Sequence, residues 1–357
     1  MRSGAGATPV RRRSHLFAGV VLTVLLGLST GHARAGAQGF VAETYGQPHQ
    51  LVAVRGTRRL NLVCLGQGTP TVVFLSGLGS GTFDWRRVQP AVGRLTRACA
   101  YDRAGYGFSD PLDGPADADN ARSDLHALLR ATMPGRVILV GHSLGGLYAT
   151  LYAEAYPKDL AGLVLVDPAF PGQTRAIARA VGPSAARKLA GWQAAQIAMQ
   201  EECVVLARRG LLSTPAEAGS ACLDNPANAD SDVHRDINRE AITAAYESAV
   251  ESELRNANLA DASGRTRDDL EAARTRASLG SLPVVVLTHG DGSGLPGLDA
   301  GQLAREAAAW KAGHDAIARL SSDGASIVVP QAGHFIQLDQ PGIVIEQIAR
   351  ILAKARR

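Results

Sequence analysis

Residues 141–145 read Gly-His-Ser-Leu-Gly, which is the G-x-S-x-G spacing of a motif whose serine can carry a reactive hydroxyl group. The aliphatic run 137–140 before it has the length and branching of a buried strand, and the residues after Leu144 favour a helix. A serine on so sharp a turn needs neighbours without side chains, which Gly141 and Gly145 provide, and the turn exposes its Oγ above the sheet edge. The motif predicts that Ser143 is a nucleophile. The simpler alternative is a glycine-rich connection in another α/β protein.

A serine hydroxyl needs a neighbouring base, because serine is a weak nucleophile at its ordinary pKa. The chain has nine histidines. His334 is favoured because it follows the last predicted strand, 326–329, in a short loop that returns to the edge presenting Ser143. His142 belongs to the sharp turn at 141–146, which we call the elbow, and we expect its ring to point away from Ser143. Surface positions or local hydrogen bonds are expected for four others, His126, His234, His289 and His314.

Alternating strands and helices must position these residues. Strands are predicted at 51–55, 60–65, 71–75, 97–101, 163–166, 283–287 and 326–329, and helices at 120–129, 302–320 and 343–355. A further helix at 85–95 is interrupted by Pro90 and Gly93. The third strand leads into residues 76–81, whose glycines allow amides to converge on one point. The amides of Leu78 and Leu144 are therefore predicted to stabilise the oxyanion of a tetrahedral intermediate. The Gly-Lys-Ser/Thr ending of a phosphate loop is missing from this segment.

Four motifs in this order resemble the α/β-hydrolase superfamily, in particular its serine esterases and lipases. They are Ser76-Gly77-Leu78-Gly79 with Trp85, the loop 101–109, the elbow 141–146, and Gly333-His334, and they extend over nearly all of the chain after residue 35. The resemblance implies a mostly parallel sheet with helices on both faces. One departure is Ser76, which stands where the family often has histidine.

Two aspartates could orient the imidazole. The family's common arrangement places the acid after the strand at 283–287, where Asp291 follows; some relatives use the end of the strand at 163–166, where Asp167 stands. The order Ser, Asp, His holds for both. Asp167 is favoured because it is fixed before a proline, whereas glycines flank Asp291; Asp291 stays the alternative. Structural roles are expected for Asp102, Asp110 and Asp339, with Arg103 as an ion-pair partner.

The alternation of strands and helices is absent from residues 171–281, which contain amphipathic stretches such as 185–206 and 236–254. This insertion resembles the helical cap that such hydrolases place over the active site. The alternative is a helical elaboration that never touches substrate. The predicted organisation is a signal peptide at 1–35, a hydrolase core at 36–170 and 282–357, and a cap at 171–281.

The N-terminal residues have the pattern of an export signal. Arginines at 11–13 precede a short apolar segment at 16–28, and Ala33-Arg34-Ala35 matches a cleavage site. We predict a secreted or periplasmic protein without a stable membrane anchor; an uncleaved anchor is the alternative. Five arginines and no acidic residue precede Gly36, so the mature chain would have a formal charge of −1 rather than +4. The basic pI therefore gives no support for nucleic-acid binding.

Four cysteines in an exported chain can form two disulfides. Cys64 and Cys99 lie on strands that are neighbours in the expected fold, and Cys203 and Cys222 both lie in the insertion. We predict the pairs Cys64–Cys99 and Cys203–Cys222, with buried free thiols as the alternative.

The resulting hypothesis is an exported serine hydrolase that cleaves small carboxylic esters without a metal or organic cofactor. The chain has no CxxC pair and no HExxH run. Amide or peptide hydrolysis, carbon–carbon bond hydrolysis and cofactor-free perhydrolysis are also compatible with a serine elbow. Dehalogenase and epoxide hydrolase chemistry is disfavoured, because those relatives place aspartate at the Ser143 position. A non-catalytic binding protein with the same fold is the alternative of another class.

Overall fold

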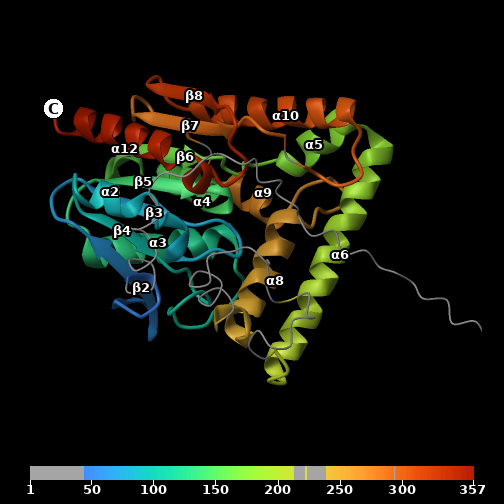
Figure 1. Ribbon diagram of the computed structural model, residues 1–357, viewed down its shortest axis with the longest axis horizontal. Coiled ribbons are helices and arrows are strands. Elements are labelled where there is room, and N and C mark those ends of the chain that lie inside the picture. The colour runs from blue at the N-terminus through green and yellow to red at the C-terminus, as the bar shows by residue number, and fades with distance from the viewer. Residues whose placement is uncertain (1–43, 213–221, 223–238, 276, 293) are drawn as a thin grey trace, which may run out of the picture. The chain divides into compact units, whose positions relative to one another are not determined.

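The structure is a computed structural model that describes residues 44–212, 222, 239–275, 277–292 and 294–357 (Figure 1). An eight-stranded sheet with the order β1-β2-β4-β3-β5-β6-β7-β8 forms its centre. The strands are β1 Gln50–Arg55, β2 Arg58–Leu65, β3 Thr71–Leu75, β4 Ala98–Tyr101, β5 Val137–His142, β6 Leu160–Val166, β7 Val284–His289 and β8 Gly324–Val329. β1 pairs antiparallel with β2 and β2 with β4, whereas all other pairs are parallel. The prediction of a mostly parallel sheet is confirmed.

Helices cover both faces of this sheet. The helices of the chain have the bounds η1 Thr82–Trp85, α2 Gln89–Gly93, α3 Ala118–Thr132, α4 Ser143–Ala155, η2 Pro157–Asp159, α5 Gln173–Val181, α6 Pro183–Arg208, α8 Ala244–Asn258, α9 Arg267–Ala272, α10 Ala300–Ala318, α11 Ile336–Asp339 and α12 Pro341–Ala355. α3, α4 and α10 contribute side chains to the apolar cluster on one face, and α2 and α12 to the cluster on the other. This is the layered arrangement expected when parallel strands are joined by helices.

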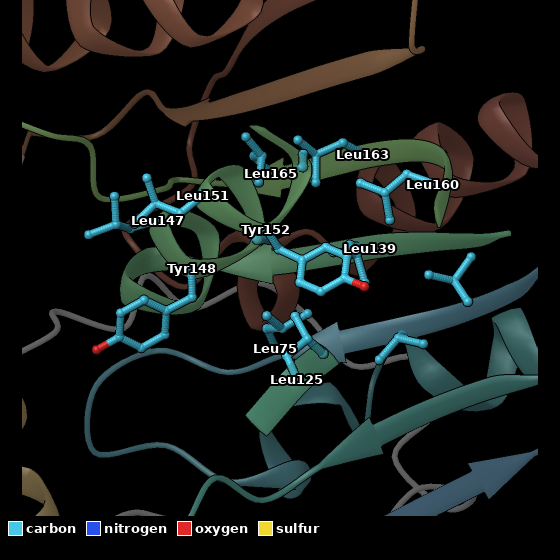
Figure 2. Close-up of a cluster of buried hydrophobic side chains, with 14 of the residues drawn as sticks. Leu75, Leu125, Leu139, Leu147, Tyr148, Leu151, Tyr152, Leu160, Leu163 and Leu165 are labelled. Atoms are coloured by element: carbon cyan, nitrogen blue, oxygen red, sulfur yellow. The ribbon is translucent and has the colours of Figure 1, made fainter. Parts of the chain in front are cut away.

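The central strand β5 is buried along its whole length. Val137 and Leu139 belong to one apolar cluster and Ile138 and Val140 to the other, as the period of two in a strand requires. Figure 2 shows Leu139 among leucine and tyrosine side chains from neighbouring strands and helices. Burying each such side chain contributes about 1.5–3 kcal/mol. The packing on both faces therefore holds the end of β5 in place, directly before Ser143.

Helices α5, α6, α8 and α9 follow β6 in the chain and precede β7. The amphipathic stretch predicted at 185–206 lies within α6. Of the stretch predicted at 236–254, residues 236–238 lie outside the described residues. Helix α8 begins at Ala244, where the Thr243 side chain caps it by accepting a hydrogen bond from the Tyr246 amide. The predicted helix at 85–95 is wrong in its extent, because only α2 forms there, with proline in its first turn.

Both predicted disulfides are present. Cys64 and Cys99 stand opposite each other in the antiparallel β2–β4 pair, with their Cα atoms 4.0 Å apart, and Cys203 on α6 is joined to Cys222. In the part of the chain that the structure describes, no helix combines the length and the hydropathy needed to cross a membrane. The predicted signal peptide at 1–35 and His234 lie outside the described residues.

Candidate active site

Ser143 stands between β5 and α4 with a backbone φ of +50°, a left-handed conformation that is unusual for a serine. Two glycines make this turn possible. A Cβ on Gly145 would lie 2.4 Å from the Ser76 carbonyl oxygen, and one on Gly141 would lie 2.6 Å from the carbonyl oxygen of Gly145. A methyl group fits at neither position. The sequence motif is therefore a steric requirement of this turn.

The imidazole of His334 lies beside the serine hydroxyl. Its Nε2 is 2.9 Å from Ser143 Oγ, and its Nδ1 is 2.5 Å from Asp167 Oδ2. A carboxylate can only accept, so Nδ1 carries the proton and Nε2 is free to accept one from the serine hydroxyl. The three side chains form a hydrogen-bonded relay in the order Ser, His, Asp, although they are separated by up to 191 positions in the sequence.

Asp167 is completely buried and accepts four hydrogen bonds. Oδ1 accepts from the His289 amide and from Trp310 Nε1 on α10, and Oδ2 accepts from the rings of His289 and His334. Burial works to raise the pKa of this carboxyl, but the hydrogen bonds from His289 and His334, together with the attraction of the carboxylate to an imidazole when it is protonated, outweigh burial and hold the pKa well below its ordinary value. Asp167 is therefore ionised and rigidly oriented toward His334.

The amides of Leu144 and Leu78 are the two groups predicted to bind a developing negative charge beside Ser143. Leu144 is in the first turn of α4, where backbone N–H groups have no partner within the helix. On the opposite side, a Cβ added to Gly77 would lie only 3.2 Å from Ser143 Cβ, so the loop that contains Leu78 passes directly beside the nucleophile. Ser76 replaces the histidine common in similar proteins; its buried hydroxyl accepts from Trp85 Nε1 and donates to the Gly81 carbonyl.

The sequence profile of the alpha/beta hydrolase family matches residues 72–347 of this chain. The chain belongs to the α/β-hydrolase family. Family membership assigns this α/β hydrolase to the hydrolytic enzymes.

Relatives of this α/β hydrolase are named for different substrates. A 2-hydroxy-6-oxononadienedioate/2-hydroxy-6-oxononatrienedioate hydrolase from Paraburkholderia xenovorans is 41% identical over 107 residues, 28% of this chain and 37% of that protein. The (lyso)-N-acylphosphatidylethanolamine lipase of Mus musculus is 34% identical over 101 residues, 27% of this chain and 30% of the lipase. The matched segment thus spans about a third of each curated relative.

Solved structures share the fold of this α/β hydrolase. An esterase from Thermogutta terrifontis aligns over 86% of this chain and 97% of its own with a TM-score of 0.54 and 22% identity. A haloalkane dehalogenase variant from Bradyrhizobium elkanii aligns over 86% of this chain and 96% of its own with a TM-score of 0.62 and 17% identity. At these identities the likeness extends to the fold and not to the reaction.

The structure does not bring Asp291 to His334. Its side chain is exposed, and its amide donates to the Ala332 carbonyl. The end of β7 instead presents His289, whose side chain is 6% exposed and whose Nδ1 is 2.7 Å from Asp167 Oδ2. Burial works to lower the pKa of His289, but the hydrogen bond and charge of Asp167 outweigh burial and raise it.

His289 therefore corrects the expectation of a surface position or a local hydrogen bond, because its side chain is buried and bonds Asp167, 122 positions away. A signal for it exists in the sequence. It ends the strand after the insertion, and β7 lies next to β6, the strand that leads into Asp167. Parallel neighbours end at the same sheet edge, so the two side chains had to meet there.

The other histidines have mixed outcomes. His142 does not simply point away: its Nε2 donates to the His334 carbonyl at 3.0 Å, which fixes the loop of the base. Burial and the neighbouring His334 lower the pKa of His142 to about 3, so its ring is neutral. His314 bonds Thr288 and the Pro168 carbonyl, and His126 bonds Tyr152, as expected for local contacts.

Among the described residues, Asp167, His289 and His334 form a group whose potential metal-ligating atoms lie within 4.8 Å of one another. In this α/β hydrolase those atoms hydrogen-bond one another, and His334 also bonds Ser143. Arg103 corrects another expectation, because it forms its ion pair with Glu253 on α8 and not with Asp102, Asp110 or Asp339.

Proposed function

We propose that this protein is an exported serine hydrolase that cleaves carboxylic esters through an acyl-enzyme on Ser143. The observation that carries the proposal is the 2.9 Å contact between His334 Nε2 and Ser143 Oγ, with the buried carboxylate of Asp167 on the other ring nitrogen. This geometry is suited to removing the serine proton as the hydroxyl attacks a carbonyl carbon.

The reaction would then proceed in two halves. Attack forms a tetrahedral intermediate whose oxyanion accepts hydrogen bonds from the amides of Leu78 and Leu144. His334, now protonated, gives its proton to the leaving alcohol, and Asp167 stabilises the imidazolium meanwhile. In the second half His334 takes a proton from water, which attacks the acyl-enzyme and releases the acid.

The residue types at the site favour this chemistry over that of some structural neighbours. Halide displacement and epoxide opening on this fold use an aspartate nucleophile, and this chain has serine at that position. Carbon–carbon bond hydrolysis is the second candidate, because the Paraburkholderia relative, which matches at 41% identity, is named for a 2-hydroxy-6-oxo diacid. Amide hydrolysis and perhydrolysis use the same elbow and are further alternatives.

The insertion at 171–281 is proposed as a cap that shapes the substrate pocket. Its helix α8 supports this proposal, because Tyr246, Val250 and Leu254 pack with Leu78 and Tyr106 in one apolar cluster. The two disulfides support export, since such bonds persist in oxidising compartments. Intact mass spectrometry of the protein from the periplasm or medium should give a chain that begins near Gly36 and has no alkylatable thiol.

A fluorophosphonate probe and a substrate panel test the catalytic proposal. The wild type should be labelled and should hydrolyse p-nitrophenyl esters of some acyl length, and Ser143→Ala should do neither. Turnover of a vinylogous 2-hydroxy-6-oxo acid at a higher kcat/KM than any ester would favour the second candidate. If a folded wild type showed neither labelling nor turnover, the alternative of a non-catalytic binding protein with this fold would be favoured.

A further inference from the structure

A buried network connects helix α8 to the loop that would bind the oxyanion. Glu253 on α8 is 2% exposed and accepts from Arg103 through both oxygens, at 2.6 and 2.9 Å. The same guanidinium donates to the carbonyl oxygens of Ser76 at 2.5 Å and Gly77 at 2.8 Å. Arg103 is thus clamped between a carboxylate from the insertion and two carbonyls of the loop.

The Gly77 carbonyl matters because of the geometry of the peptide bond. A trans peptide is planar, so its C=O and N–H groups point in opposite directions. The N–H group opposite the Gly77 carbonyl is that of Leu78, the proposed oxyanion donor. A cation bonded to the carbonyl therefore fixes the direction of the Leu78 N–H and polarises it toward stronger donation.

Two tyrosines hold the next residue of the loop. The Gly79 amide donates to Tyr106 Oη at 3.3 Å, and Tyr106 in turn donates to Glu253 at 2.6 Å. From α8, Tyr246 donates to the Gly79 carbonyl at 2.8 Å. Both polar groups of Gly79 are thus bonded to residues that α8 carries or contacts.

We propose that α8 sets the oxyanion donor in position through Glu253, Arg103 and Tyr246, so that the insertion contributes to transition-state stabilisation besides covering substrate. These are positioning residues, since none of them touches the reacting atoms. The inference rests on the proposed function, in which the Leu78 amide binds the oxyanion. It also explains how the loop keeps its shape without the histidine that Ser76 replaces.

The test compares binding of the transition state with binding of the substrate. Tyr246→Phe removes one hydroxyl from a partly buried ring and should fold; we expect kcat to fall about five-fold, as for one lost hydrogen bond, with KM within two-fold. Glu253→Gln should lower kcat by about 10- to 100-fold, less than the 10²–10³ lost with a whole oxyanion donor. The affinity for a trifluoromethyl ketone, which forms an oxyanion on the serine, should fall by the same factors.

Ser252→Ala is the matched control. Ser252 neighbours Glu253 on α8 but accepts from the Ala116 amide, away from the oxyanion loop. It should leave both kcat and ketone affinity at the wild-type level. The rate of fluorophosphonate labelling serves as a readout that needs no known substrate, because phosphonylation also develops charge on oxygen.

Outcomes separate this inference from the proposed function. A wild type that fails to react with the fluorophosphonate overturns the proposed function and, with it, the inference. A reactive wild type whose Tyr246→Phe and Glu253→Gln variants keep wild-type labelling rates and ketone affinity overturns the inference alone. Equal losses in KM and ketone affinity would also overturn it, because a general disturbance of the pocket predicts that pattern.

Discussion

His289 Nδ1 donates to Asp167 Oδ2 at 2.7 Å, the same oxygen that receives His334 Nδ1 at 2.5 Å. Two imidazoles therefore share one buried carboxylate, and only one of them reaches the serine. The second imidazole fills the strand end that the family's common arrangement gives to the acid. In this chain it bonds a carboxylate that follows the neighbouring strand β6, the carboxylate that we propose as the acid.

Replacing His289 should separate its hydrogen bond from its charge. His289→Ala should lower kcat by about 10- to 150-fold, the equivalent of one charge-assisted hydrogen bond. His289→Asn offers an uncharged donor in a similar position and should retain more activity. Steady-state kinetics of the two variants check this, and equal activity of wild type and His289→Ala would contradict a positioning role.

The raised pKa of His289 gives a pH-dependent prediction for stability. A histidine whose folded pKa is raised stabilises fully below its unfolded value of about 6.5, and this contribution is lost as the pH rises through the folded pKa. Chemical denaturation should therefore show a larger stability difference between wild type and His289→Asn at pH 5.5 than at pH 9. His126→Asn, a histidine on the α3 surface, controls for general charge effects; a pH-independent difference for His289→Asn would refute the assignment.

Asn substitutions distinguish the two candidate acids. Asp167→Asn should lower kcat by about 10⁴-fold, because the amide favours the wrong imidazole tautomer and cannot stabilise imidazolium. Asp291→Asn should change kcat by less than about two-fold, since its side chain is exposed. The reverse pattern would mean that the acid is Asp291.

The buried carboxyl of Glu247, in the insertion, leads to a second prediction for the pH dependence of the free energy of unfolding. It lies on α8, buried against Gln200 of α6. Burial raises the pKa of Glu247 to about 7, although the hydrogen bond from Gln200 works to lower it. Because the folded state holds this proton more tightly than the unfolded state, stability should fall as the pH rises from about 4.5 to 7. Glu247→Gln should remove that fall and become the more stable protein at pH 8. Exposed Glu202→Gln is the control, and parallel stability curves for wild type and Glu247→Gln would contradict the prediction.

Gly77→Ala tests how closely the oxyanion loop approaches the nucleophile. The new methyl would lie 2.9 Å from His142 Nδ1 and 3.2 Å from Ser143 Cβ, so the loop must shift and kcat should fall at least about ten-fold. Gly191→Ala on α6 meets no atom within 4 Å and should stabilise the fold by up to about 1 kcal/mol without changing kcat. Wild-type kcat in a folded Gly77→Ala variant would show that the loop is not a close neighbour of the reaction.

The sequence predicts well where local chemistry decides the structure. β3 occupies the predicted residues 71–75, and the elbow forms where Gly141 and Gly145 make a tight turn possible. The buried aliphatic run before Ser143 identifies the central strand, because few other elements have that pattern. Chain order and short loops then place His334 at the correct sheet edge.

Contacts that depend on strand order or on distant elements leave weaker signals in the sequence. His289 meets Asp167 only because β6 and β7 are neighbours, and pairing between elements so far apart leaves no local periodicity. Glu253 meets Arg103 across 150 positions, so no local pattern in the sequence indicates this ion pair. The predicted helix at 85–95 failed for a local reason, because Pro90 suits a helix start rather than its interior.

The central claim is that Ser143 carries the acyl group during turnover. Rapid quenching of the enzyme with a p-nitrophenyl ester, followed by intact and peptide mass spectrometry, measures this directly. The account predicts a transient acyl adduct on Ser143 that forms and decays at rates consistent with kcat, and neither adduct nor turnover in Ser143→Ala. Undiminished ester hydrolysis by Ser143→Ala, or turnover by the wild type without any adduct on this serine even in a slowly deacylating ester, would contradict it.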